Sequence, residues 1–358
     1  MKKRAICLLL TALVLCAVSC RPAENAPAAS QGTPAPPTPS PEAENVSFVT
    51  PEPTASFTLE PIPTPTPTPE VTPTPAPTDT PEPTDTPVPD RIGILRYDLI
   101  DKFSDRVIDT NDRYVDGTIC ITVTRTETKE RTGNTLVYFV ADIYVQNVES
   151  IRRGIGGNSY RDMHARSIKK FSKECSAIVA MSGDYCTTDD PAFVVVNGFI
   201  VHQTKELNRD LCVLFRDGEM KTYSPGDIDT EALKERGVWQ TWNFGPMLLD
   251  ENGEPLKEFN SPDRVFGRNP RAVLGYFEPG HYCFVVVDGR QNGYSMGLTL
   301  EELAALMKDL GCKAAYNLDG GISAQIAWHA KRLNHPGKDR SLIDIVYVPY
   351  PEAAEETP

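Results

Sequence analysis

Two short polar segments near the end of the chain carry residue types that could bind and transform a ligand. One is Asp288-Gly289-Arg290, and the other contains Asn317, Asp319, Gly320 and Gly321. Arginine presents a planar fork that fits a phosphate or a carboxylate, and glycines let backbone amides approach a ligand closely. Asn317 and Asp319 are two positions apart, so an extended chain would turn both to one side. A single Asp-Gly pair is more typical of a plain turn.

The elements around these segments should bring them together. Residues 272–277 and 282–287 are expected to be strands, and the second of them leads into Asp288. A helix is predicted over 300–310, because Thr299 and Glu302 form a capping box and Gly311 can end it. A further strand, 313–318, leads into Asp319. A strand–helix–strand unit favours parallel pairing with both carboxyl ends at one edge, where ligands of α/β sheets bind.

The rest of the folded part is rich in strand signals. Residues 118–124 and 136–145 should form a hairpin across 132–134, and 161–173 is expected to be helical. Shorter apolar runs bounded by Gly, Pro, Asn or Asp predict strands at 177–181, 193–196, 211–215 and 247–249. The fold class is therefore α/β (mixed α+β), with a mixed β-sheet core and flanking helices in a single globular domain.

The amino terminus has the pattern of an export signal. Positive residues precede an apolar stretch, 5–18, that is short for a membrane span. Small residues then lead to Cys20, as in a bacterial lipobox. We expect residues 1–19 to be a lipoprotein signal peptide, Cys20 to be lipidated, and the protein to be extracellular on the bacterial cell membrane. An ordinary secretory signal is the alternative.

A proline-rich segment, 20–90, follows the signal. Its stretch 21–90 holds 21 of the 32 prolines of the chain, with repeated Thr-Pro pairs. Such a composition cannot bury a core and favours an extended stalk. We divide the remainder into an N-terminal β-rich part, 91–149, a main domain, 150–349, and an acidic tail, 350–358.

Charge and cysteine content exclude some functions. The net charge of −13 provides no basic stripe and argues against nucleic acid as a partner. An even count of six cysteines in an exported domain permits disulfides. Cys120, Cys212 and Cys283 lie in strand-like apolar runs, however, and no spacing fits zinc, so buried free thiols are expected for most. The six cysteines are Cys120, Cys175, Cys186, Cys212, Cys283 and Cys312.

An ordered set of motifs resembles the phosphodiester glycosidase family. The chief matches are the segments 269–275, 286–290, 295–303 and 315–321, and supporting matches lie at 180–185, 244–246, 340–341 and Asp344. The resemblance implies hydrolysis of a sugar-1-phosphodiester, in surface glycans or wall polymers. Such a site must hold an anionic phosphodiester and stabilise an oxocarbenium-like transition state.

The resemblance also implies roles for individual residues. Asp319 is the first candidate for general acid/base or nucleophile, with Asp288 or Asp184 as the second carboxylate. The predicted phosphate ligands are Arg271, Arg290, the amides of Gly320 and Gly321, and the hydroxyl of Ser323. Sugar hydroxyls would be bound by Asn317, Asn158 and Asp184. No cofactor is required, although Asp184, Asp288 and Asp319 could together bind calcium.

Two departures from the family pattern favour a second interpretation. Ile322 and Ala324 stand where the family usually has glycine and serine. Isoleucine does not readily adopt a positive φ, so a turn that needs one would be remodelled. The alternative is a non-catalytic cell-wall glycan-binding module with the same pocket. A purely structural stalked adhesin would leave the polar set unexplained.

Overall fold

The computed structural model describes residues 97–129, 133–157, 159–185 and 187–351. The chain divides into two units, 1–80 and 81–358, and all described residues belong to the second. The predicted signal peptide, Cys20, the stalk, Asn158 and the tail beyond Pro351 lie outside the described residues. Within the described part, no helix is long and apolar enough to cross a membrane.

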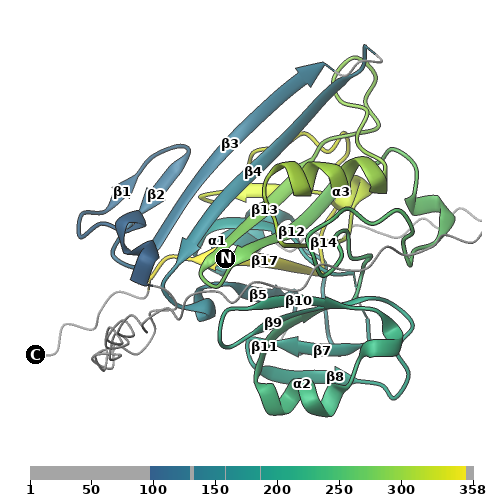
Figure 1. Ribbon diagram of the computed structural model, residues 1–358. Coiled ribbons are helices and arrows are strands. Elements are labelled where there is room, and N and C mark those ends of the chain that lie inside the picture. The colour runs from purple at the N-terminus through teal and green to yellow at the C-terminus, as the bar shows by residue number, and fades with distance from the viewer. Residues whose placement is uncertain (1–96, 130–132, 158, 186, 352–358) are drawn as a thin grey trace, which may run out of the picture. The chain divides into compact units, whose positions relative to one another are not determined.

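Strands dominate the described part, and every ladder between them is antiparallel (Figure 1). The largest sheet has seven strands in the order β1-β2-β3-β4-β13-β12-β14, and a second has five in the order β16-β15-β6-β17-β5. The seven-stranded sheet comprises β1 (Ile108–Asp109), β2 (Arg113–Val115), β3 (Ile119–Lys129), β4 (Thr135–Val145), β12 (Arg271–Glu278), β13 (His281–Val287) and β14 (Ala314–Asn317). The five-stranded sheet comprises β5 (Arg152–Ile155), β6 (Ala177–Ser182), β15 (Ile326–Trp328), β16 (Lys331–Arg332) and β17 (Asp344–Pro349).

The two smaller sheets and the helices complete the description. The small sheets have the orders β10-β9-β11 and β7-β8. Their strands are β7 (Phe193–Val196), β8 (Phe199–Gln203), β9 (Leu211–Phe215), β10 (Met220–Tyr223) and β11 (Val238–Trp242). The α-helices are α1 (Ile168–Glu174), α2 (Thr230–Arg236) and α3 (Leu300–Asp309).

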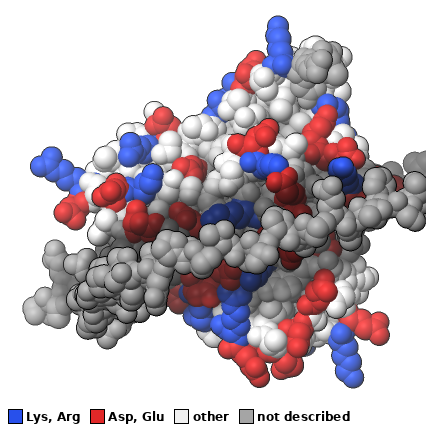
Figure 2. Space-filling model, viewed as in Figure 1, with Lys and Arg blue, Asp and Glu red and all other residues white. Residues whose placement is uncertain are grey.

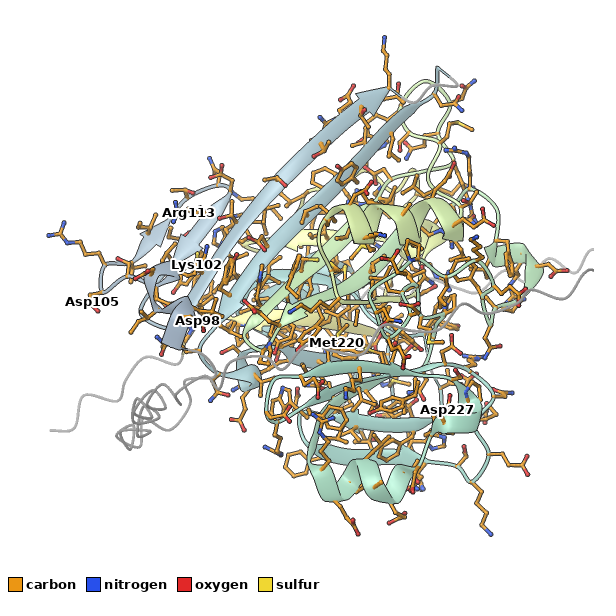
Figure 3. All side chains as sticks on the ribbon, viewed as in Figure 1. Asp98, Lys102, Asp105, Arg113, Met220 and Asp227 are labelled. Atoms are coloured by element: carbon orange, nitrogen blue, oxygen red, sulfur yellow. The ribbon has the colours of Figure 1, made fainter. Side chains whose placement is uncertain are left out.

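Both faces of the seven-stranded sheet are buried at β12 and β13. In β13, Phe284 and Val286 turn to a core shared with β6 and β17, whereas Val285 and Val287 turn to α3. The alternation of strand side chains thus supplies two apolar faces from one continuous apolar run. Met220 of β10 also belongs to the shared core, and it lies between the three-stranded sheet and the sheets above it (Figure 3).

The far face of the five-stranded sheet is covered by α1. Ile168 and Phe171 of this helix pack against Ala180 of β6 and Ile345 of β17. The layers are therefore α1, five-stranded sheet, seven-stranded sheet and α3. The expectation of sheets with flanking helices is confirmed, although strands make up far more of the fold than helices do. The expected mixed sheet is wrong, because all strand pairs of the described residues are antiparallel.

The predicted parallel pairing of 282–287 with 313–318 is wrong. β12 lies between β13 and β14 and is antiparallel to each, so β13 and β14 run in the same direction without touching. Their carboxyl ends still meet at one edge, which is the feature that matters for the site. The reason is the tight turn after β12, which places β13 beside β12 before α3 returns the chain.

The other predicted elements mostly match. The hairpin is β3 and β4, and the helix over 300–310 is α3 with the expected capping box. The predicted helix over 161–173 is wrong in its first half, because α1 begins only after Ser167, whose side chain caps it. Residues 247–249 form isolated bridges rather than a strand.

Candidate active site

The candidate site lies where the two large sheets meet at one edge. β12 begins there, β13 and β14 end there, and Arg271 is paired with Val287 across the ladder. β6 of the other sheet ends at the same place, because the amide of Asp319 donates to the carbonyl of Gly183 at 3.1 Å. Segments far apart in the sequence are thus joined by the sheet termini.

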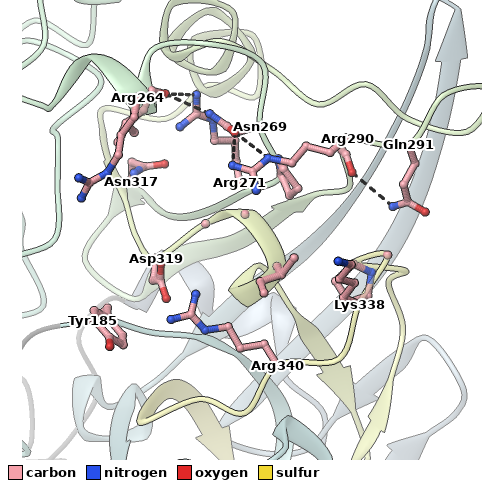
Figure 4. A pocket seen from close by; sticks show the side chains of 18 of the residues that line it. Tyr185, Arg264, Asn269, Arg271, Arg290, Gln291, Asn317, Asp319, Lys338 and Arg340 are labelled. Carbon is pink, nitrogen blue, oxygen red and sulfur yellow. Dashed lines mark hydrogen bonds between the residues drawn. The ribbon is translucent and has the colours of Figure 1, made fainter. Parts of the chain in front are cut away.

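A cavity of about 920 Å³ opens at this edge (Figure 4). Its lining combines arginine, lysine, asparagine and glycine with a few aromatic rings. Of the residues predicted from sequence, the cavity brings together Arg271, Arg290, Asn317, Asp319, Gly320 and Gly321. A narrow extension beneath it is lined by Asp184, Asp319 and Ser323.

The charge of the lining is strongly positive for so acidic a protein. Five basic side chains line the cavity, against the single carboxylate of Asp319: Arg264, Arg271, Arg290, Lys338 and Arg340. None of the five makes an ion pair with a carboxylate in the part of the chain that the structure describes, whereas surface arginines such as Arg236 and Arg332 do. On the face shown in Figure 2, acidic and basic side chains are interspersed. The cavity is therefore suited to an anion.

Arg271 is a buried cation that makes no ion pair with a carboxylate of the described residues. Its side chain donates to the carbonyls of Leu298, Val265 and Gly267, which fix the guanidinium in place. Burial and the charge of Arg290 lower its pKa to about 10. A bound phosphate would relieve both effects, because it would supply the missing negative charge.

Arg290 is held over the glycine turn. Its Nε and Nη2 donate to Oδ1 of Asn269 at 2.9 and 2.6 Å. Gly321 has a φ of +60°, and a Cβ there would lie 3.3 Å from Nη1 of Arg290. The glycine thus allows both the left-handed conformation and the close approach of the guanidinium.

The predicted use of the Gly321 amide for phosphate is wrong. This amide donates to the carbonyl of Pro270 at 2.9 Å, so it is already satisfied. Gly320 is required because a Cβ there would lie 2.7 Å from the same carbonyl. The amide of Gly320 stabilises the carboxylate of Asp319. The two glycines therefore shape the turn and leave anion binding to the arginines.

Ile322 does not disturb this turn. Positive φ is needed at Gly321 and not at Ile322, which lies in the short 3-10 turn Gly321–Ser323 and lines the cavity. The remodelling expected from the Gly-to-Ile departure is therefore absent at the backbone.

Asn317 presents an unsatisfied acceptor to the cavity. Its amide nitrogens donate to the loop 244–246, through Nδ2 to the Gly245 carbonyl and through the backbone to Pro246. Its Oδ1 is buried and has no hydrogen-bond partner among the described residues. An orphaned buried acceptor is costly, so a donor such as a sugar hydroxyl fits this position.

Asp319 is the carboxylate of the cavity. Burial raises its pKa, while the Ser323 hydroxyl, the Arg340 guanidinium and the Gly320 amide act in the opposite direction, and the charge of Asp184 raises it again. The result is a pKa above the usual aspartate value of 3.8. A carboxyl shifted toward neutrality is suited to exchange protons during a reaction.

A buried cluster of one arginine and two aspartates lies under Asp319. Arg153 donates to Oδ2 of Asp344 at 2.8 Å through Nε, and it lies 3.5 Å from Oδ2 of Asp184. Asp344 also accepts from the amide of Asp184. Burial, opposed by Arg153 and reinforced by Asp184, raises the pKa of Asp344 to about 7. One cation thus serves two carboxylates.

Asp184 takes part in this cluster rather than in the open cavity. Its Oδ2 accepts from the amide of Asn243 at 2.7 Å, and burial raises its pKa against the charge of Arg153. The structure therefore places Asp184 outside the lining of the main cavity, where its charge raises the pKa of Asp319.

Asp288 is placed differently from its predicted catalytic role. It is fully buried and does not line the cavity. Its carboxylate accepts from the Tyr294 hydroxyl, Nδ2 of Asn334 and the amide of His335. These contacts anchor the loop that carries Lys338 and Arg340. The sequence predicted the correct sheet edge for Asp288, but this residue directly follows the end of β13 and its side chain is buried in the interior.

Residues 176–348 match the family model described as phosphodiester glycosidase. This is the family the chain resembles in its motifs. A structural match agrees in fold: the catalytic domain of zebrafish N-acetylglucosamine-1-phosphodiester alpha-N-acetylglucosaminidase, described as auto-inhibited by its pro-peptide. The two share 19% sequence identity at a TM-score of 0.53, over 70% of this chain and 87% of that chain.

A curated relative comes from Bacillus subtilis strain 168. It is the SPbeta prophage-derived uncharacterized protein YomE, 30% identical over 145 residues. The match covers 40% of this chain and 22% of YomE, so the chain spans about a fifth of that protein's length.

The site and its surroundings also contain residues to which the sequence patterns assigned no role. Arg153 carried no signal, because it lies outside the matching motifs and within the short strand β5. Arg264 and Lys338 sit in polar loops whose approach to the cavity depends on tertiary structure. Arg340 and Asp344 lay in a matched segment but had no role.

Metal binding finds no support in the geometry. Among the described residues, no group of three or more His, Cys, Asp and Glu side chains is arranged to hold a metal ion. Asp288 is separated by its own hydrogen bonds from Asp184 and Asp319, so the calcium hypothesis loses one of its three ligands.

The cysteines agree with the expectation of free thiols. Five are free, namely Cys120, Cys175, Cys212, Cys283 and Cys312, while Cys186 lies outside the described residues.

Proposed function

We propose that the domain hydrolyses the glycosidic bond of sugar-1-phosphodiesters in surface glycans or wall polymers. The observation that carries the proposal is the cavity in which Asp319 is the lone carboxylate among five basic side chains without acidic partners. That arrangement fits a reaction in which an anionic group must be held while one acid or base acts.

Each polar residue of the cavity has its own role in the proposed reaction. Arg271 and Arg290 hold the phosphodiester oxygens, and Asn317 accepts a hydroxyl of the sugar. As the bond between the anomeric carbon and the bridging oxygen breaks, positive charge develops on the sugar and negative charge on the departing phosphate. The arginines stabilise the departing phosphate. Asp319 either takes a proton from the water that bonds to the anomeric carbon, or it bonds to that carbon itself and is released when water displaces it in a second step. Phosphate departs without strong protonation, so one carboxyl is sufficient.

A panel of sugar-1-phosphodiesters tests this proposal. The soluble domain, beginning near Arg91, is incubated with each compound, and the release of free sugar is measured. Release from at least one compound, abolished by boiling the protein, supports hydrolysis. Failure to release sugar from any of them contradicts it.

Ile322 supports a second candidate, a glycan-binding module without turnover. Its side chain lines the cavity at a position where the family usually has glycine, so it narrows the space beside Asp319. Calorimetry with the same panel separates the two functions, since binding without release of sugar would establish the module.

Arg290→Lys should weaken substrate binding more than catalysis. Lysine keeps the charge but lacks the fork, and it cannot make both contacts with Asn269. Loss of one charge-assisted hydrogen bond predicts a rise in KM of about tenfold, with a smaller fall in kcat. Steady-state kinetics measure both constants. A fall confined to kcat would place Arg290 in the chemical step instead.

We also propose that Cys20 anchors the protein at the outer face of the bacterial membrane. The small residues before Cys20 and the proline-rich segment after it support this. Cys20→Ser should move the protein from the membrane fraction to the medium or soluble fraction, as immunoblots of both fractions would show. Cys7→Ser, in the apolar stretch, is the control. Retention of Cys20→Ser in membranes would rule out the lipid anchor.

A further inference from the structure

The cavity carries more positive charge than one phosphodiester can neutralise. Five basic side chains and one carboxylate leave a net charge of +4, since 5 − 1 = 4. A phosphodiester brings a single negative charge. Uncompensated cations at short range repel one another, and the charge of Arg290 adds to burial in lowering the pKa of Arg271. The charge balance therefore calls for a ligand with more than one anionic group.

The cations come from separate parts of the cavity wall. Arg271 and Arg290 lie at the ends of β12 and β13, whereas Lys338 and Arg340 belong to the loop that Asp288 anchors. Figure 4 shows Arg271 and Arg290 on one side of the cavity and Lys338 and Arg340 on the other. Arg340 acts on Asp319, so it belongs to the reacting end. Among the residues that the structure describes, Lys338 makes no ion pair with a carboxylate, and it marks a second position.

Hydrogen bonds hold the loop that carries Lys338 in place. The amide of His335 donates to buried Asp288 at 3.0 Å, and Nδ1 of His335 lies 2.7 Å from Oε1 of Gln291. Nε2 of Gln291 donates to the His335 carbonyl. These contacts fix the loop at His335, three residues before Lys338, and Lys338 itself lines the cavity.

We propose that the cavity binds two consecutive phosphates of a polymeric sugar phosphate. The reacting phosphodiester lies at Arg271 and Arg290, near Asp319. The neighbouring phosphate of the same chain lies at Lys338. This inference rests on the proposed function, and it identifies the substrate class as an oligomer or polymer with repeated phosphodiesters. The volume of 920 Å³ lies near the upper end of the roughly 300–1,000 Å³ of ligand pockets, which accommodates more than one sugar phosphate.

A matched pair of substrates tests the inference. Both carry the same sugar-1-phosphodiester; in one the aglycone is a neutral alkyl chain, and in the other that chain ends in a second phosphodiester. One added ion pair in a partly exposed cavity predicts a KM about tenfold lower for the second compound. The difference should shrink at high salt, because screening weakens exposed charge pairs.

Lys338→Gln should reduce that preference to about twofold, because it removes the cation assigned to the second phosphate. The control is Lys313→Gln, which makes the same charge change at an exposed residue before the amino end of β14. It should preserve the tenfold ratio. Equal KM values for the two compounds in the wild type, or a ratio unchanged in Lys338→Gln, would overturn the inference.

The failure of the inference is distinct from the failure of the proposed function. If the wild type cleaves both compounds equally well, only the second phosphate position is refuted. If it cleaves neither, hydrolysis of these phosphodiesters is refuted. Calorimetry then measures the dissociation constants of the two compounds, and their ratio replaces the ratio of KM values. Equal dissociation constants overturn the inference there too.

Discussion

Asp319→Asn should lower kcat by about a hundredfold or more, in line with the usual contribution of a positioned acid, base or nucleophile. Asparagine keeps the shape of the side chain but removes the ionisable oxygen. The backbone bond from Asp319 to Gly183 is unaffected, so the fold should persist. The measurement is the rate of sugar release at saturating substrate, with circular dichroism to verify folding.

Asp309→Asn provides the matched control for this variant. Asp309 is exposed at the end of α3, away from the cavity. Its substitution by asparagine removes the same charge and keeps the same side-chain shape as Asp319→Asn. Its kcat should equal that of the wild type. Near-full activity of Asp319→Asn would show that another residue supplies the reacting carboxyl. Asp184, which lines the extension beneath the cavity, would then be the next candidate.

The pH profile adds a second readout for Asp319. Its pKa lies above the usual 3.8, chiefly because of burial. If the ionised form is required, kcat/KM rises as the pH increases through that raised pKa; if the protonated form is required, kcat/KM falls there. In either case this limb of the profile should be missing from the residual activity of Asp319→Asn.

Local sequence patterns predicted the strands well because their signals lie within a few residues. The runs that became β12 and β13 are bounded by a turn, and the cap of α3 lies entirely between Thr299 and Glu302. The pairing order was not predictable in this way. An antiparallel hairpin and a helical crossover together place β12 between β13 and β14. No single segment of the sequence is enough to predict this strand order.

The site was partly predictable for a similar reason. Arg290, Asn317 and Asp319 follow strand ends, so a correct strand direction is enough to bring them to one edge. Arg153 and Lys338 come from segments whose position depends on the packing of the whole domain. The inward turn of Asp288 was also invisible, because it depends on donors supplied by Tyr294 and Asn334.

The buried cluster under the site connects stability with activity. Asp344 accepts from the amide of Asp184, and the neighbouring Gly183 carbonyl accepts from the amide of Asp319. Arg153 holds Asp344 at one end of this chain of contacts. Displacement of the two carboxylates would therefore shift the backbone that positions Asp319.

Arg153→Met should lower the free energy of unfolding by about 3–5 kcal/mol, because it leaves two buried carboxylates without their cation. Without Arg153 the pKa values of Asp184 and Asp344 should rise further above that of the unfolded chain. The loss is then largest above those raised pKa values and smaller as the pH falls and the carboxyls take up protons. Denaturant unfolding at pH 8 and pH 5 measures the difference.

Arg152→Met is the neighbouring control, since Arg152 is only partly buried and donates to the carbonyl of Glu149. It should change stability by no more than about 0.5 kcal/mol. Adding Asp344→Asn to Arg153→Met removes one of the stranded charges and should restore part of the loss at pH 8. If Arg153→Met were no less stable than Arg152→Met, the cluster would not stabilise the fold. If it unfolded more easily but kept the full kcat while folded, the contacts from Asp344 to Asp319 would have no part in positioning the carboxyl.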